Sequence, residues 1–428
     1  MKLVCRLSED GFKLEKSQSI DLNCKKEFKY TFWKHNNTYA EFYKDEAIDM
    51  LYLSMAVFAA DRLILRETGE DAWSREIELY MPVLCADKWN ACQSLVEEML
   101  NFLTGDKWKI YFRGRESTEI EKKAKRKWEK STEKKEDISK ICMFSGGLDS
   151  CIGAINLLCN SEDNSDIVFV SHYGGGKGTI EYQDLLKTAF MKKFDLDENC
   201  FIQNYAAVIS GQEDTTRSRS FMFFAHAIAY ASAMDKEVEL IIPENGLISL
   251  NIPLAYTRTA TSSTRTTHPH YMKMLQKLIE ELEIRVKINN PFQFKTKGEM
   301  VLECEDRDFL QMVLDKTMSC SHPDIGRYQG MKKTMHCGYC LPCTIRRASI
   351  QKGKLNDTST YFDSKYKNLP IARQAYRTYK CAFNRFDEKK AFLRIQESGP
   401  IEENIDQFAD LYVRGMKEMK ECLEKINV

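Results

Sequence analysis

The feature that most constrains this chain is a glycine-containing turn between a strand-like segment and an apolar segment that suits a buried helix. Residues 138–144 precede the turn and residues 151–158 follow it. A strand, a tight turn and a helix start direct several backbone N–H groups and the positive end of the helix dipole to one point, where serine hydroxyls add donors. The sequence therefore predicts a cradle for pyrophosphate, formed by Ser145, Gly146, Gly147, Leu148, Asp149 and Ser150.

Asp149 gives this turn a carboxylate that can hold a Mg²⁺ ion between phosphate oxygens. The turn is not a Walker loop, because the Gly-Lys-Ser/Thr ending is absent here and in the glycine-rich residues 174–178. An ordinary strand-to-helix turn is the alternative, which the flanking strand and helix make less favoured. Residues 145–150 (SGGLDS) resemble the PP-loop motif of ATP pyrophosphatases. That resemblance implies cleavage of ATP between its α and β phosphates, with adenylation of a substrate.

Composition and charge argue against several classes of protein. The 428 residues suffice for two or three domains, and 43% apolar with 29% charged residues indicates hydrophobic cores beneath a water-exposed surface. A net charge of zero weakens a role in nucleic-acid binding. Residues 221–234 form the longest apolar run, which is too short to span a bilayer.

Cysteine usage points to a metal site. Fifteen cysteines are many for a chain whose first ten residues lack a signal-peptide pattern, so we expect a cytoplasmic protein with metal-binding cysteines and no disulfides. Two overlapping C-x-x-C spacings and one upstream cysteine suit a tetrahedral structural zinc ion, held by Cys320, Cys337, Cys340 and Cys343. An iron–sulfur cluster has the same ligands, and His322 or His336 can replace one cysteine.

Residues 138–354 alternate strand-like and helical segments, which predicts an α/β domain with a doubly wound, Rossmann-like parallel sheet. Strands are expected at 138–144, 166–173, 201–205 and 238–243, and helices at 179–194 and 221–234. Ligands of such sheets bind beyond the carboxyl ends of the strands, where residues 145–150 would lie.

The remaining segments flank this domain. Residues 1–120 are interpreted as an N-terminal accessory α+β domain, with a helix over 48–62 and a strand over 76–83. Because Pro82 cannot donate to a strand ladder, we expect that strand at a sheet edge. Residues 121–137 are interpreted as a charged linker or solvated helix, and residues 355–428 as a helical C-terminal extension.

The order of the motifs resembles that of 7-cyano-7-deazaguanine synthases, the QueC family. The similar segments are residues 145–150, residues 267–272, residues 296–300 (TKGEM) and the cysteine cluster followed by Arg346. This resemblance covers residues 138–350. With its added terminal regions, the chain resembles the enlarged QueC-like proteins of bacterial anti-phage systems, such as QatC of the Qat system and the related protein of type IV CBASS.

The resemblance implies a PP-loop domain with structural zinc and ATP-dependent adenylation of the carboxylate of 7-carboxy-7-deazaguanine. The housekeeping enzyme uses ammonia to form an amide and then, after a second activation, the nitrile. Defence-associated relatives are expected to stop at the amide, with the N-terminal amine of a partner protein as nucleophile. That reaction is the leading hypothesis. Free nitrile synthesis, tRNA thiolation and a non-catalytic nucleotide-binding scaffold are the alternatives.

Four further residues are candidates for contacts with the nucleotide. Lys297 lies in the TKGEM segment and is expected to contact phosphate, with helix-terminus structure as the alternative. Arg217 and Arg219 precede the apolar helix 221–234, where a guanidinium can meet the α-phosphate, or lie simply on the surface. His172 lies near the end of the second strand and is expected to contact the cofactor.

The predicted substrate contacts come from two segments. Glu244 and Asn245 follow the strand 238–243 at the expected ligand edge and are candidates to bind the nucleobase. Arg258 and Arg265 lie in or beside a Ser/Thr-rich segment that can act as a lid whose arginines stabilise departing pyrophosphate. A plain exposed loop is an equal alternative for that segment.

Overall fold

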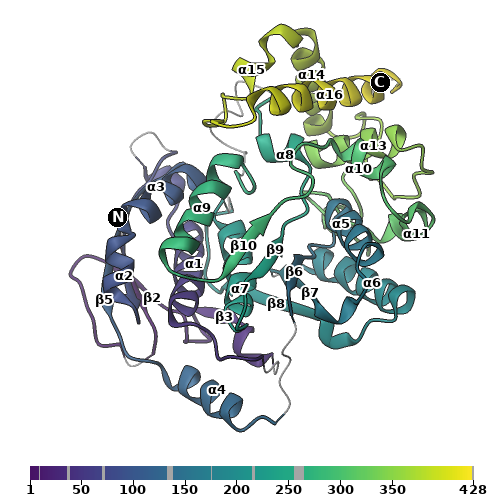
Figure 1. Ribbon diagram of the computed structural model, residues 1–428. Helices are drawn as coiled ribbons and strands as arrows, with labels where there is room; N and C mark the ends of the chain where they lie inside the picture. Colours follow the sequence, from purple (N-terminus) through teal and green to yellow (C-terminus); the bar gives the residue numbers. More distant parts are fainter. Residues whose placement is uncertain are drawn as a thin grey trace.

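The computed structural model describes residues 1–8, 10–35, 39–69, 73–132, 138–174, 176–214, 217–254 and 265–426. They form two parallel sheets with helices around them, and a helical C-terminal region lies at one end (Figure 1). Among these residues, the helices are nowhere both long and apolar enough to cross a membrane. All fifteen cysteines lie in the described ranges, and none forms a disulfide.

The larger sheet has the strand order β10-β9-β6-β7-β8-β3. Its strands are β3 (Phe28–Tyr30), β6 (Lys140–Met143), β7 (Ile167–Tyr173), β8 (Phe201–Val208), β9 (Val238–Ile241) and β10 (Val286–Asn289). Every neighbouring pair is parallel except β8 with β3, so the predicted doubly wound parallel sheet is confirmed. The sequence interpretation did not include β10 and β3, which are only four and three residues long.

Alternating strand residues divide the core between the two faces of this sheet. Ile141 and Val168 pack into one hydrophobic cluster, whereas their neighbours Cys142 and Phe169 pack into another. The first cluster includes α7 (Arg219–Ala231) and α9 (Pro269–Glu281), and the second includes α5 (Leu148–Cys159), α6 (Lys177–Phe194) and α11 (Arg307–Val313). Helices therefore cover both faces of the sheet, as α/β architecture requires.

The strand order places a topological switch point beside β6. The chain proceeds from β6 to β7 on one side and returns to β9 on the other. Ligands bind in the crevice that such a reversal opens beyond the carboxyl ends of the strands. The segments that leave β6 and β9 are residues 144–147 and 242–245, so both the predicted pyrophosphate loop and Glu244 lie at this edge.

The N-terminal sheet has the order β2-β1-β4-β5, from β1 (Lys2–Arg6), β2 (Gln18–Asp21), β4 (Glu76–Val83) and β5 (Lys107–Gly114). All its pairs are parallel, so this unit has the parallel strands of an α/β layer where we expected α+β. The predicted edge position of the 76–83 strand is wrong, because β4 lies between β1 and β5. Pairing with β1 ends at Tyr80, and Pro82 therefore pairs on one side only, with β5.

Helix α1 (Asp45–Leu63) joins the N-terminal unit to the PP-loop domain. Residues 47–61 are all buried, so the helix is covered on every side. It packs against α7, and β3 adds a strand to the larger sheet. One hydrophobic cluster therefore extends across the predicted domain boundary, whose place in the chain stays a prediction.

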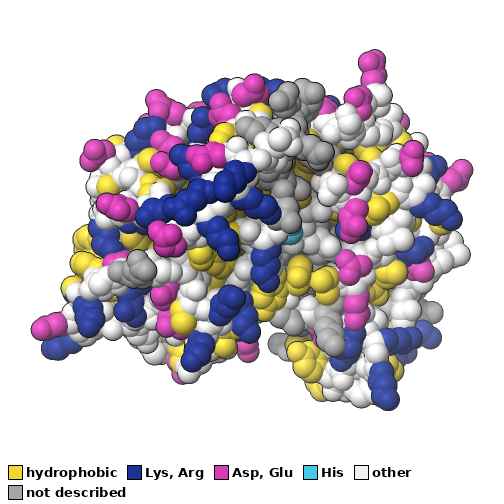
Figure 2. Space-filling model, turned by 90° about the horizontal axis from the view of Figure 1, so that it is seen from below, with side chains coloured by type: hydrophobic (Ala, Val, Ile, Leu, Met, Phe, Trp, Pro, Cys, Tyr) yellow, Lys and Arg dark blue, Asp and Glu magenta, His cyan; other side chains and the backbone are white. Residues whose placement is uncertain are grey.

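The charged segment after the N-terminal sheet forms α4 (Glu119–Glu129) rather than an extended linker over residues 119–129. Its first turn has a capping box between Thr118 and Glu121, which satisfies two backbone N–H groups. Trp128 anchors the helix by donating to the Tyr39 carbonyl at 2.9 Å. Figure 2 shows Lys and Arg side chains gathered over this part of the surface, which agrees with the solvated-helix interpretation.

The C-terminal extension is helical as predicted, with α14 (Pro370–Asn384), α15 (Ala391–Arg394) and α16 (Ile405–Glu424). These helices share a third hydrophobic cluster with α8 (Gly246–Leu250) and α13 (Leu341–Lys352). Figure 1 shows α16 lying across the end of the PP-loop domain, above α8 and near α13 and α10 (Lys297–Leu302). The extension is thus packed directly on the helices that leave the ligand edge.

Candidate nucleotide site and metal centre

The SGGLDS turn has a fixed backbone shape. Gly146 has φ +86°, a left-handed conformation that favours glycine, and a Cβ there would lie 3.1 Å from Gln183 Cγ. Gln183, which is buried, donates from Nε2 to the carbonyls of Ser145 at 3.2 Å and His172 at 3.0 Å. The Met318 N–H donates to the Gly146 carbonyl at 2.7 Å. Two other segments therefore hold the turn beside β7.

Hydroxyl groups line the start of α5, where the sequence predicts the pyrophosphate. Ser145 Oγ and Ser150 Oγ are 3.1 Å apart, and the Gly147 N–H donates to Ser145 Oγ at 3.3 Å. The Leu148 N–H donates to Ser319 Oγ at 3.2 Å. Ser145 is exposed, so an anion can reach the two amides and the two hydroxyls of this turn. Ser319 was not predicted, and its only sequence signal is its place beside Cys320.

Asp149 is the centre of a buried polar cluster. Its Oδ2 accepts from Asn245 Nδ2 at 2.7 Å, and its Oδ1 pairs with Lys297 Nζ at 3.1 Å. All three side chains are buried. Gly153 on α5 permits this approach, because a Cβ there would lie 2.4 Å from Cβ of Pro243, at the exit of β9. The structure therefore brings three residues predicted from distant segments to one point.

Glu244 adds a second carboxyl to this cluster. Burial raises the pKa of Glu244 well above its usual range, and the neighbouring Asp149 carboxylate, with which it shares a hydrogen bond, raises it further. Lys297 opposes that rise through its positive charge. Two carboxyls and one ammonium thus face one another at the switch point. Oxygen ligands of this kind are what Mg²⁺ prefers, so Asp149 and Glu244 fit the magnesium that accompanies ATP.

Two helix starts present the partners of Asp149. Asn245 is the N-cap of α8, and its Oδ1 accepts the Ile248 N–H at 3.1 Å. Thr296 is the N-cap of α10 in a capping box with Glu299, which directs Lys297 into the cluster. Both arrangements follow from local sequence, since Asn and Thr are favoured N-caps.

Helix α16 holds both of these helix starts. Thr296 Oγ1 donates to Glu418 Oε1 at 2.5 Å, and Arg414 pairs with Glu299. Leu411 lies against Gly246 at the start of α8. Sequence reasoning missed these contacts, because nothing local marks Glu418 or Arg414 as partners of a segment more than 100 residues away.

His172 and Arg219 lie together at the end of β7. Phe223 separates them, with its ring 4.2 Å from the imidazole and 5.1 Å from the guanidinium carbon. Burial lowers the pKa of His172 well below its usual range, so its ring is neutral. Neither ring nitrogen has a hydrogen-bond partner among the described residues. The Gln183 bond to the His172 carbonyl places this group beside the SGGLDS turn, and its contact with a cofactor stays a prediction.

Two other predicted arginines lie away from this cluster. Arg217 is buried, donating from its backbone to Asp61 Oδ2 at 2.7 Å and from Nη1 to the Thr104 carbonyl at 2.8 Å. Arg265 donates to the Phe102 carbonyl at 2.7 Å and lies over the Phe102 ring. These contacts fasten both arginines to the N-terminal unit instead of the Asp149 cluster. Arg258 lies outside the described residues.

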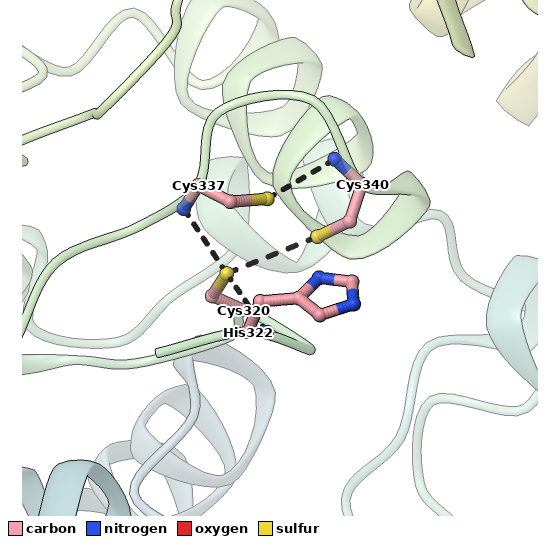
Figure 3. Close-up of side chains that lie close together, drawn as sticks. All are labelled: Cys320, His322, Cys337 and Cys340. Atoms are coloured by element: carbon pink, nitrogen blue, oxygen red, sulfur yellow. Dashed lines mark hydrogen bonds between the residues drawn. The ribbon is translucent and has the colours of Figure 1, made fainter. Parts of the chain in front are cut away.

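The predicted cysteines lie together between β10 and the C-terminal helices (Figure 3). The Sγ atoms of Cys320 and Cys340 are 3.9 Å apart, as are those of Cys337 and Cys343. Four sulfurs placed about 2.3 Å from a tetrahedral zinc ion would be about 3.8 Å apart, so these distances fit zinc. Backbone N–H groups of Cys337 and Cys340 donate to sulfur, at 3.1 and 3.3 Å. These residues therefore form a zinc-binding cluster of the four-cysteine type.

Two histidines flank this cluster in different ways. His322 groups with Cys320, Cys337 and Cys340, the potential ligand atoms all lying within 4.8 Å of one another. His336 is buried, with Nε2 3.2 Å from the Thr317 carbonyl and Nδ1 3.8 Å from Cys343 Sγ. A fifth donor thus lies beside the four predicted thiols. The Cys320 thiol lowers the pKa of Cys337 to about 6, which favours the thiolate that zinc requires.

Residues 214–354, about a third of the chain, match the family model described as queuosine biosynthesis protein QueC. The match supports a QueC-like chain. It contains Glu244, Asn245, Lys297 and the whole cysteine cluster, and it begins after the SGGLDS turn. The combination indicates a PP-loop, ATP-utilising enzyme related to 7-cyano-7-deazaguanine synthesis. The search of curated proteins returned no match.

Proposed function

We propose that this chain adenylates the carboxylate of 7-carboxy-7-deazaguanine and transfers the acyl group to an amine, most specifically the N-terminal amine of a partner protein in a Qat-like anti-phage system. The supporting observation is the contact of Asp149 with Asn245 and Lys297. Asp149 lies in the PP-loop turn, whereas its two partners lie in the segment that matches QueC. One site therefore joins an ATP-cleavage motif to the QueC-like region.

The proposed chemistry has two steps. A carboxylate oxygen attacks the α-phosphorus of ATP, pyrophosphate leaves with its bonding electrons, and an acyl-adenylate forms. The amine nitrogen then attacks the acyl carbon, AMP leaves with the electrons of the broken C–O bond, and the amine gives up a proton to water. The amides and hydroxyls of residues 145–150 suit the binding of the departing pyrophosphate. Magnesium, when bound, would neutralise phosphate charge, with Asp149 and Glu244 as its fitting ligands.

Lys297 has a separate role in this proposal. In the free protein its ammonium compensates the two carboxyls, and it lies where phosphate charge would develop. The zinc cluster has a structural role, since its cysteines are packed among the C-terminal helices. Zinc would join the loop that carries Cys320 to the start of α13, and the same loop supplies Ser319 to the SGGLDS turn.

Incubation with 7-carboxy-7-deazaguanine, ATP and Mg²⁺ tests the proposal, with the products and the partner protein followed by mass spectrometry. We expect AMP and pyrophosphate, and a mass increase at the partner's amino terminus. Asp149→Asn should abolish both, whereas Asp163→Asn on an exposed loop should not. Formation of ADP in place of AMP would contradict the assignment of the reaction.

A second candidate is synthesis of the free nitrile, which the QueC match favours because that family model is described by queuosine biosynthesis. It shares the adenylation step and differs in its nucleophile. Ammonia-dependent release of 7-cyano-7-deazaguanine, with no mass increase on any protein, would support this candidate. Binding of ATP without release of AMP would support a non-catalytic scaffold instead.

A further inference from the structure

A cavity of 330 Å³ lies next to the Asp149 cluster and has no role in the proposed adenylation step. Its walls come from α8, the start of α9, the residues that follow β10, and residues 400–404 before α16. This volume is within the range of about 300–1,000 Å³ that is common for ligand sites. The cavity therefore has the size of a binding site for a small molecule or a short peptide end.

Two lining residues connect the cavity to the Asp149 cluster. Asn290 Nδ2 donates to the Glu244 carbonyl at 2.9 Å, and Ser249 Oγ donates to the Asn245 carbonyl at 3.2 Å. The side chains of Glu244 and Asn245 in turn face Asp149. One layer of residues thus separates the cavity lining from the centre of the proposed reaction.

The lining suits a peptide that bears a free amine. Ser249 and Thr267 form a buried hydroxyl pair at 2.9 Å, and the amides of Asn289 and Asn290 add donors and acceptors for a peptide backbone. Charge at the rim is negative, because Glu402 and Glu403 both pair with the single Lys273, each at 2.9 Å. A carboxylate excess attracts an ammonium group.

The origin of the walls separates this cavity from the QueC-like region. Residues 249–293 of the lining fall inside the QueC match, whereas residues 400–408 lie beyond its end at residue 354. The C-terminal extension therefore completes a cavity that the matched segment forms only in part. A feature completed in this way fits the part of the reaction that differs from free nitrile synthesis, which is the acceptor.

We propose that this cavity binds the amino-terminal residues of the polypeptide acceptor and directs their amine toward the Asp149 cluster. This inference rests on the proposed function. The bound amine forms the C–N bond with the acyl carbon while the acyl C–O bond to AMP breaks, as in the second step above. The rim carboxylates attract the charged amine, and the amides hold the first peptide units.

Two variants and two matched controls test the acceptor site. Gln293→Trp would fill the cavity from an exposed lining position, and Gln407→Trp places the same side chain at an exposed position outside it. Glu403→Lys reverses rim charge, and Glu421→Lys makes the same change on the exposed side of α16. The probes are a mixed library of pentapeptides with free amino termini, and hydroxylamine as a small amine.

We expect both cavity variants to lower kcat/KM for peptide acylation by about tenfold or more. Hydroxamate formation and acid-dependent ATP–pyrophosphate exchange should stay close to wild type, and both controls should match wild type throughout. Unchanged peptide acylation in the cavity variants would overturn the proposal, as would a wild-type protein that forms hydroxamate but acylates no peptide.

Two other results point elsewhere. A raised KM for the acid in the exchange assay would assign the cavity to the deazaguanine acid and overturn an acceptor site. Absence of acid-dependent exchange in the wild-type protein would refute the proposed function itself, and the acceptor site with it. The exchange assay thus distinguishes failure of the acceptor site alone from failure of the whole reaction.

Discussion

Replacement of Lys297 by Met tests whether its ammonium is required between two buried carboxyls. Lys297 Nζ lies 3.1 Å from Asp149 Oδ1, and both side chains are less than a tenth exposed. At that separation an effective dielectric constant of about 20 gives an attraction of about 5 kcal/mol. Removal of one partner of a buried ion pair costs about 3–5 kcal/mol, so Lys297→Met should lower the free energy of unfolding by that amount.

Lys295→Met is the matched control. Its ammonium pairs with Glu303, but the lysine side chain is 40% exposed and the glutamate 53%. Exposed pairs contribute about 0–1 kcal/mol, so this variant should stay near wild type. Urea titration of the wild type and both variants measures the difference directly.

The loss should also depend on pH. Because the pKa of Glu244 is raised in the folded protein, its contribution to stability is greatest at low pH and is lost as pH rises above the unfolded pKa of about 4.3. Lys297 opposes the raised pKa, so its removal should raise that pKa further and steepen the loss. The gap between Lys297→Met and wild type should therefore widen with increasing pH. A gap below 1 kcal/mol, or one that stays constant with pH, would refute this account of the cluster.

Three further perturbations test other parts of the structure. Gly146→Ala should destabilise the protein by about 1–2 kcal/mol, because an L-residue is strained at φ +86°, and it should weaken ATP binding; urea titration and ATP binding assays measure both, and unchanged values would contradict the described turn. Glu418→Gln should flatten the pH dependence of stability, because burial first and Glu299 next raise the pKa of Glu418 to about 7, a contribution lost as pH rises from about 4.5 to 7; Glu421→Gln is the exposed control, and parallel profiles of Glu418→Gln and wild type would exclude this role. Elemental analysis should find zinc, and its chelation should lower the thermal stability; iron with visible absorption would instead support an iron–sulfur cluster.

The parts of the fold that could be predicted are those that local sequence specifies. The four strands of the PP-loop domain are apolar runs with glycine or helical segments between them, and each is present in the larger sheet. Closely spaced cysteines must approach one another, so the cluster at residues 337–343 followed from spacing alone. The position of Asp149 beside Asn245 followed from the rule that ligands bind where strand order reverses.

The parts that could not be predicted depend on contacts between distant segments. The interior position of β4 depends on β1 pairing with only its first half, which the Pro82 signal does not reveal. Arg217 and Arg265 have the composition of phosphate ligands, yet Asp61 and Phe102 engage them. The contact between Glu418 and Thr296 joins two helices whose pairing no local pattern indicates. Tertiary packing decided each of these cases.

Exchange of labelled pyrophosphate into ATP, in the presence of 7-carboxy-7-deazaguanine and the absence of any amine, tests the central claim most directly. Reversible adenylation needs only ATP, Mg²⁺ and the acid, so the measurement is independent of the partner protein. The account predicts exchange that requires the acid and disappears in Asp149→Asn. Exchange that ignores the acid, or none at all in a folded protein that binds ATP, would contradict it.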